Sequence, residues 1–381
     1  MDFTAIQQVI EARTPERSAQ TLRSAVWWTL VAIAGFLIVD SAIFRSGWYS
    51  KYLSPDSTTG EVEYHLLWLN RMPPAKTPSI VVVGDSRIAE GFSSRVANGA
   101  TGGGINFVNL GMPGATPRVW YYTLRDADPA RNRFSVIAIM LDQYSDQDAG
   151  EEGQNRTPDM NYLAQRLRLS DCWDFAQSWD DAALRKTALT GCLFPGTRLR
   201  SDVADFLSNI RLRLRRASDW RNNGARYQSD YTGIPMDLTG LWVDWPTRTI
   251  HFPAGLTNQQ TETIRTAVLP HPEPQTGALT RYRQRWLGGI TDLYRNSSTR
   301  IVFFEIPRAP VPVPDAKEPA RFVNSVVARP QVSVLPENAF RELEHPEVFA
   351  DGYHLNQKGR VVFSALLAHT LQAEAAPAQR R

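Results

Sequence analysis

Cysteine is rare in this chain of 381 residues, which contains only Cys172 and Cys192. Two cysteines exclude a disulfide-dense scaffold, a zinc site built from four cysteines and a metal cluster held by thiolates. They leave two states open, because the pair forms one disulfide in an oxidising compartment or stays as two buried thiols in a reducing one. The compartment therefore decides between these two states.

Histidine is also rare. Apart from one histidine in a C-terminal motif, five histidines occur, and no two of them have the spacing of metal ligands. These residues are His65, His251, His271, His345 and His369. The run Gly102-Gly103-Gly104 lacks the Lys-Ser/Thr pair of a phosphate-binding loop, so we interpret it as a flexible turn. We therefore expect neither a metal nor a cofactor.

A strong excess of charge is missing as well. Lys and Arg number 42 and Asp and Glu 39, a formal net charge of +3. This is a narrow surplus rather than the broad basic field of a nucleic-acid-binding protein, so nucleic acid is not expected as a partner. A mean hydropathy of -0.33 excludes a polytopic membrane protein, although an average does not exclude one apolar segment.

One long apolar run does exist, and it extends from Ala25 to Phe44 with a single charge at Asp40. About twenty apolar residues are enough to span the hydrocarbon core of a bilayer. Trp27 and Trp48 lie near the two ends, as in the aromatic belts of spanning helices, and Asp40 is close enough to one end to snorkel toward the interface. We interpret residues 25–44 as a transmembrane helix.

A cleaved signal peptide is the alternative, because the strictly uncharged core of this run is short and lies near the N-terminus. An uncleaved signal anchor fits better, since the preceding segment carries both acids and bases and no clear A-x-A cleavage site follows. Basic residues are slightly more frequent before the run than after it, which places residues 1–24 in the cytoplasm. The rest of the chain is then extracytoplasmic, in a bacterium periplasmic, and a Cys172–Cys192 disulfide is favoured.

Short runs of β-branched and apolar residues follow a neck at residues 45–76, and they alternate with segments of helical pattern. Runs of this kind suit strands that are buried on both faces of a parallel sheet. We predict an α/β fold for residues 77–381, a doubly wound, flavodoxin-like three-layer sheet with ligands at the carboxyl ends of its strands. The four predicted strands are Ser79–Val83, Asn106–Leu110, Ser135–Leu141 and Arg300–Ile306.

Residues 145–285 interrupt this alternation with polar sequence that is rich in Arg and Trp, which we interpret as an insertion or cap. The arginines that follow Asn209 are expected on a solvated helix face, and the Pro-rich segment from Pro307 as a surface loop near the active edge. Exposed tryptophans would suit a platform for sugar rings. The candidates are Trp173, Trp179, Trp220, Trp242 and Trp245.

Ser86 lies in a Gly84-Asp85-Ser86 motif directly after the first predicted strand. This position exposes a hydroxyl at the carboxyl end of a buried strand, where a helix can begin and its N-H groups favour developing negative charge. Alone the motif is weak, because Asp85 or Ser86 could serve merely as a helix N-cap.

Two further motifs follow strand ends or precede helices. The second predicted strand leads into a glycine-bearing turn over Asn109–Thr116, in which the N-H of Gly114 could approach an oxyanion or belong to an ordinary loop. Near the C-terminus, Asp351 and His354 precede an apolar helix, and a carboxylate beside an imidazole fixes its tautomer. Taken singly, such a D-x-x-H spacing is more often structural.

Together and in this order, the three motifs resemble the SGNH hydrolase family, also called GDSL-type esterases. The resemblance implies that Ser86 is the nucleophile, His354 the general base and Asp351 the acid that orients it. It also implies an oxyanion hole formed by the N-H groups of Ser86 and Gly114. The family's third block, Gly-x-Asn-Asp, is absent after Leu141, where Gln143 could supply a substitute amide and the adjacent carboxylate would repel an oxyanion.

An altered third block and a membrane tether resemble the anchored group of SGNH-like proteins that act in alginate O-acetylation and teichoic acid D-alanylation. The expected function is a serine-dependent acyl-ester enzyme on an extracytoplasmic polysaccharide, an esterase if water accepts the acyl group and an O-acyltransferase if a sugar hydroxyl does. The resemblance also implies a polytopic membrane-bound O-acyltransferase partner. The alternatives are a catalytically inactive scaffold that binds polysaccharide and an assembly subunit held by its helix.

Overall fold

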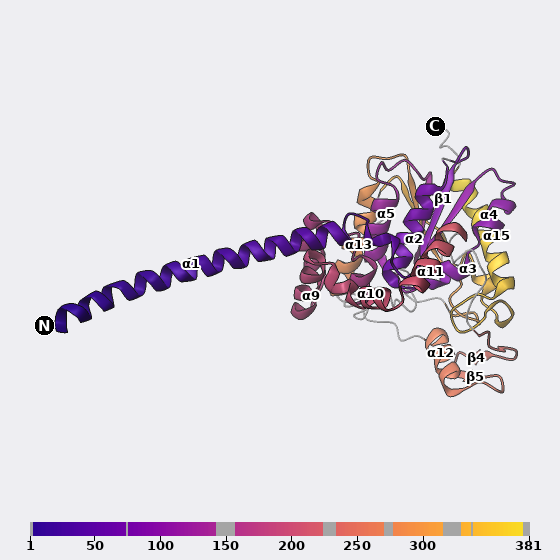
Figure 1. Cartoon of the computed structure of the whole chain (residues 1–381). Coiled ribbons are helices and arrows are strands. Elements are labelled where there is room, and N and C mark those ends of the chain that lie inside the picture. Colours follow the sequence, from indigo (N-terminus) through magenta and orange to yellow (C-terminus); the bar gives the residue numbers. More distant parts are fainter. Residues whose placement is uncertain are drawn as a thin grey trace.

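A long N-terminal helix projects from a globular body in the computed structural model of the chain, shown in Figure 1. The structure describes residues 3–73, 75–141, 157–223, 234–269, 277–314, 329–336 and 338–375.

The body is built around a parallel sheet of five strands in the order β2-β1-β3-β6-β7, which confirms the predicted α/β class. The four predicted strands are present with their ends shifted by about one residue. Sequence reasoning missed β7, which has three residues and therefore too little periodicity to recognise. The strands are β1 (Ser79–Gly84), β2 (Asn106–Gly111), β3 (Val136–Leu141), β6 (Arg300–Glu305) and β7 (Val332–Val334).

Every residue of β3 and all but the first of β1 are buried, as continuous apolar runs require. Figure 1 shows one set of helices on one side of the sheet, α2 (Thr58–Arg71), α5 (Pro117–Ala127) and α13 (Gly277–Leu293). The other side carries α4 (Ser94–Ala100) and α15 (Gln357–Ala375), which pack on each other. Strand β2 pairs with one edge of β1 and β3 with the other, so the strand order reverses direction at β1. In sheets of this kind, ligands commonly bind at the carboxyl ends of the strands where the order reverses.

The residues between β3 and β6 contribute to this same core rather than only to a polar cap. Phe175, Trp179 and Trp286 are almost fully buried and belong to one hydrophobic cluster with the strands. The elements are α7 (Pro158–Tyr162), α8 (Cys172–Gln177), α9 (Ala182–Leu193), α10 (Gly196–Ser208), α11 (Ile210–Asn223), β4 (Trp242–Asp244), β5 (Thr249–His251) and α12 (Asn258–Val268).

Cys172 and Cys192 form a disulfide that joins α8 to α9. The structure therefore selects one of the two states that the sequence left open. Closing a loop with a sequence separation of 20 residues stabilises a fold by about 3 kcal/mol in the chain-entropy picture.

Two surface predictions are wrong in part. Among the arginines of α11, Arg213 is buried and pairs with Asp202 at 2.9 Å, although Arg211 and Arg215 are exposed as expected. The described part of the Pro-rich loop is largely buried, and Val313 is fully inaccessible. Both cases reflect partners that are distant in sequence.

The apolar run is helical within α1 (Phe3–Phe44), which is long and apolar enough to cross a membrane as a signal anchor or to act as a signal sequence. Asp40 does not snorkel, because it is buried and its Oδ1 accepts a hydrogen bond from the N-H of Gly196 at 3.0 Å. Phe36 contacts Phe194 with ring centroids 5.4 Å apart. Arg45 donates to backbone carbonyls of the body, so the last turns of α1 are packed into it.

Candidate active site

Ser86 is the first residue of the short helix α3 (Ser86–Gly91), directly after β1. The N-cap is Asp85 alone: its Oδ1 accepts from the N-H of Arg87 at 2.8 Å, and its carboxylate also pairs with the Arg87 guanidinium. The Ser86 side chain does not cap the helix, and its Oγ lies 2.9 Å from Nε2 of His354.

Ser86, His354 and Asp351 form a continuous chain of hydrogen bonds across 268 residues of sequence. Nδ1 of His354 lies 2.9 Å from Oδ2 of Asp351, and Oδ1 of this carboxylate accepts from the N-H groups of Tyr353 and His354 at 2.7 Å each. Asp351 is buried, whereas Ser86 and His354 are partly accessible. This arrangement can remove a proton from a serine hydroxyl that a substrate can reach.

The two ionisable members stabilise each other's charged forms. Burial by itself would raise the pKa of Asp351, but hydrogen bonding and the charge of His354, with the two N-H donors, lower this pKa to about 2. Burial opposes a charged imidazole at His354, yet the hydrogen bond and charge of Asp351, with smaller effects of Glu90 and Asp85, raise its pKa above 6.5. His354 therefore holds an accepted proton more strongly than a free histidine.

These shifts predict a pH profile for ester cleavage. His354 must be neutral to accept the Ser86 proton, so kcat/KM should rise with pH through one ionisation whose midpoint lies above 6.5. Initial rates between about pH 5 and pH 9 measure this midpoint. Asp351→Asn removes the carboxylate that raises the pKa of His354 and should move the midpoint to lower pH. A wild-type rate that is flat or falls over this range would contradict a His354 base.

Two glycines and an asparagine let α3 lie directly against the strand ends. A Cβ at Gly84 would collide with Ile88, and a Cβ at Gly111 with the backbone of Ala89. Nδ2 of Asn109 donates to the carbonyls of Ile88 and Phe92 at 3.0 and 2.9 Å, while its Oδ1 accepts from the N-H of Gly111. β2 thus holds α3, and with it Ser86, at a fixed position.

Gly114 lies in the turn after β2 with φ +71°, a left-handed conformation that glycine adopts without strain. Within the described ranges, neither its N-H nor that of Ser86 has a hydrogen-bond acceptor. Both groups can therefore serve a ligand. Gln143, the predicted substitute donor, lies outside the residues that the structure describes.

The turn that carries Gly114 is held by α7, which sequence reasoning did not connect with the site. The Tyr162 hydroxyl donates to the carbonyl of Pro113, and the Thr116 hydroxyl donates to Asp159 Oδ2 at 2.8 Å. Helix α7 begins more than forty residues after this turn in the chain, so no local sequence signal could have shown this contact.

Asp159 also pairs with Arg118, and both side chains are fully inaccessible to solvent. Nη1 of Arg118 lies 2.9 Å from Oδ2 of Asp159, and its guanidinium stacks 3.8 Å above the ring of Trp179. The Tyr282 hydroxyl donates to Thr116 Oγ1 at 3.0 Å. This buried polar cluster therefore holds the turn that carries Gly114 in place.

Other parts of the segment between β3 and β6 pack against the loop that carries Asp351 and His354. The N-H of Met236 donates to the carbonyl of Ala350 at 2.7 Å, and α12 approaches Gly352 so closely that a Cβ there would lie 3.0 Å from the carbonyl oxygen of Thr263.

The predicted sugar-binding tryptophans separate into different environments. Trp179 is buried beneath Arg118 and cannot meet a sugar, and Trp220 packs on Tyr64. Trp242 is 52% exposed on the β4–β5 hairpin, and its ring stacks on His251. Trp173 is 68% exposed on α8, and Trp245 is partly buried.

No three His, Cys, Asp or Glu side chains of the described residues converge as metal ligands would. Comparison with models of known protein families found no match, and comparison with curated proteins likewise found none.

Proposed function

We propose that this chain is a membrane-anchored, serine-dependent acyl-ester enzyme with an SGNH-like, doubly wound domain on the periplasmic side. The observation that carries this proposal is the hydrogen-bonded chain from Ser86 through His354 to Asp351 at the carboxyl end of β1. A buried carboxylate, an imidazole with a raised pKa and an accessible hydroxyl are the three parts of acyl transfer through a covalent intermediate.

In the proposed reaction, Nε2 of His354 takes the Ser86 proton as Oγ attacks the ester carbonyl. The C–O π electrons move onto the carbonyl oxygen, and the N-H groups of Ser86 and Gly114 stabilise this oxyanion. Collapse of the tetrahedral intermediate expels the alcohol, which takes the proton from His354, and leaves an acyl group on Oγ. An acceptor hydroxyl then gives its proton to His354 and attacks the acyl-enzyme carbonyl. Collapse of this second intermediate breaks the bond to Oγ, and His354 returns the proton to Ser86.

The acceptor is water in an esterase and a sugar hydroxyl in an O-acyltransferase. The substrate class we propose is an envelope polysaccharide, because a tethered enzyme stays beside the polymers of the cell surface. Trp242 offers an exposed ring for a sugar, and its hairpin comes shortly after Met236, whose N-H bonds to the loop that carries His354. A polytopic membrane-bound O-acyltransferase that delivers the acyl group across the bilayer is the proposed partner.

An uncleaved anchor is favoured over a cleaved signal peptide by the packing of the end of α1. Asp40 and Arg45 bond with the body, and Phe36 contacts Phe194. Cleavage after the apolar run would remove the contacts of Phe36 and Asp40 and leave the N-H of Gly196 without its partner.

Reaction with a fluorophosphonate tests the proposal. Full chain purified in a neutral detergent should be labelled on Ser86 at up to one equivalent, and it should turn over a small acetyl ester. Adding an oligosaccharide should change the product from free acetate to an acetylated sugar if the enzyme is a transferase. Absence of labelling and turnover, with sugar binding retained, would instead favour the inactive polysaccharide-binding scaffold.

A further inference from the structure

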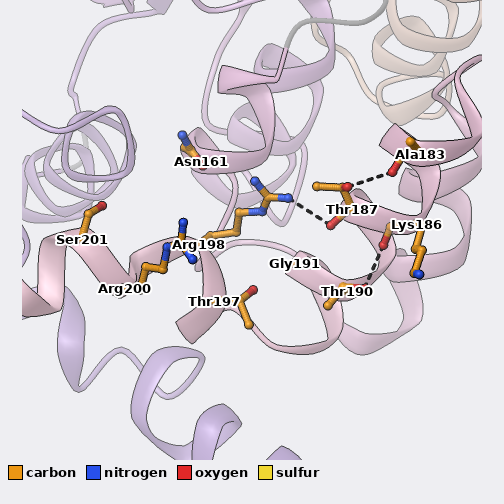
Figure 2. A pocket seen from close by; sticks show the side chains of 10 residues that line it. All are labelled: Asn161, Ala183, Lys186, Thr187, Thr190, Gly191, Thr197, Arg198, Arg200 and Ser201. Carbon is orange, nitrogen blue, oxygen red and sulfur yellow. Dashed lines mark hydrogen bonds between the residues drawn. The ribbon is translucent and has the colours of Figure 1, made fainter.

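A cavity of about 670 Å³ lies between α9 and α10, outside the candidate active site. Figure 2 shows Arg198 extending across it from α10 toward Thr187 of α9, where its Nη2 donates to the Thr187 carbonyl at 3.2 Å. Lys186 and Arg200 also line the cavity, and its lining residues include no carboxylate. Three cations thus surround a space large enough for a ligand.

Arg198 is half-buried without an acidic partner, unlike Arg118 and Arg213, and Lys186 and Arg200 are exposed beside it. Within the described ranges, neither Lys186 nor Arg200 makes an ion pair, and the one bond of Arg198 is to a backbone carbonyl. Burial lowers the pKa of Arg198, and the like charge of Arg200 lowers it further. An anion in the cavity would relieve this repulsion.

The absence of a side chain at Gly191 of α9 leaves room for the side chain of Arg198. A Cβ at Gly191 would lie 2.6 Å from Nε of Arg198, so any other residue at this position would force the Arg198 side chain to shift from its place between the two helices. The hydroxyls of Thr187, Thr190 and Thr197 are bonded to helix carbonyls, so the charged donors of the lining are the three basic groups, beside the amide of Asn161 and the hydroxyl of Ser201.

The position of the cavity indicates where its ligand comes from. Helices α9 and α10 lie at the end of the body from which α1 leaves (Figure 1), and Gly196 of α10 bonds to Asp40 at the end of the apolar run. The part of α1 that is apolar enough to span a membrane begins at Thr21, and about 30 Å of helix counted from there, the thickness of the hydrocarbon core, ends at Asp40, which places Asp40 near the level of the headgroups. Arg198 and Arg200 follow Gly196 within about one helical turn.

We infer that this cavity binds the phosphate of an anionic phospholipid headgroup, held by Lys186, Arg198 and Arg200. The lipid would then fix the orientation of the body on the bilayer in addition to the covalent tether. The inference rests on the membrane anchoring in the proposed function but not on its serine chemistry.

Lipid retention in native mass spectrometry tests the inference with full chain equilibrated in mixed micelles of phosphatidylglycerol and phosphatidylcholine. Wild type should retain phosphatidylglycerol preferentially, and Arg198→Gln/Arg200→Gln should reduce this preference by about tenfold or more, since charge-assisted bonds to phosphate are lost. Arg211→Gln/Arg215→Gln removes two exposed arginines of α11 outside the cavity and should keep the preference.

Equal retention of both lipids by wild type, or an unchanged preference in the cavity variant, would overturn the inference. Inorganic phosphate serves as the soluble probe. If phosphate raises the Tm of wild type as strongly as phosphatidylglycerol does, and the cavity variant shows no such increase, the ligand is a free anion and the lipid assignment fails. Fluorophosphonate labelling of the same samples is independent of these outcomes, so failure of the serine chemistry remains distinguishable.

Discussion

Ser86→Ala should abolish fluorophosphonate labelling and lower ester turnover by about a million-fold, because no other group can form the acyl-enzyme. His354→Ala should reduce turnover about as much, since His354 is the base that bonds to the Ser86 hydroxyl among the residues that the structure describes. Asp351→Asn keeps the shape of the triad but removes the charge that stabilises protonated His354, and should cost on the order of ten-thousand-fold. Single-turnover and steady-state assays on a small acetyl ester measure all three effects.

Ser94 offers a matched control for Ser86. It is also the first residue of a short helix, α4, and also follows a residue that caps the helix through its side chain, in this case Ser93. No histidine bonds to Ser94 in the described structure, so Ser94→Ala should keep full labelling. Labelling that survives Ser86→Ala would place the reactive nucleophile elsewhere and refute the proposed triad.

Asp159→Ala should destabilise the fold by about 3–5 kcal/mol, because it leaves the fully buried guanidinium of Arg118 without its counter-charge. The same change removes the acceptor of Thr116 and loosens the turn of Gly114, so the remaining folded protein should also lose activity. Denaturant unfolding monitored by tryptophan fluorescence gives the stability, and the acetyl-ester assay gives the activity.

Two comparisons make this prediction specific. Asp174→Ala breaks an ion pair with Arg285 that is exposed to solvent and should change the unfolding midpoint little. Arg118→Met/Asp159→Leu removes both buried charges and should be more stable than Asp159→Ala, since no charge is left unpaired. A loss below about 1 kcal/mol for Asp159→Ala would show that Arg118 finds another partner or water.

The local pattern of the chain was sufficient to predict the central strands. Val81 to Val83 and Ile137 to Leu141 read as continuous apolar runs because both faces of an inner parallel strand are covered by helices. The position of Ser86 after β1 and of His354 before α15 also follows from sequence, since strand ends and helix starts have local signals. β7 has no such signal and was missed.

The interactions that place the site come from pairs of residues that no local pattern connects. Asp159 bonds with Thr116 and Arg118, Tyr162 reaches Pro113, and Asp40 reaches Gly196. Each pair joins segments more than about thirty residues apart, where the sequence by itself does not indicate which charge or hydroxyl meets which. The prediction that Asp40 snorkels toward the membrane interface was wrong for this reason, and so was the prediction of a solvated helix face for Arg213.

By itself, the sequence determined the α/β class, the apolar helix and the candidates Ser86, Asp351 and His354, because burial, periodicity and helix ends leave marks within a few residues. Only the tertiary structure decided that Cys172 and Cys192 are bridged, that the segment after β3 completes the core and clamps the Gly114 turn, and that three cations share one cavity. These features depend on which distant segments pack together, and packing is a property of the whole fold.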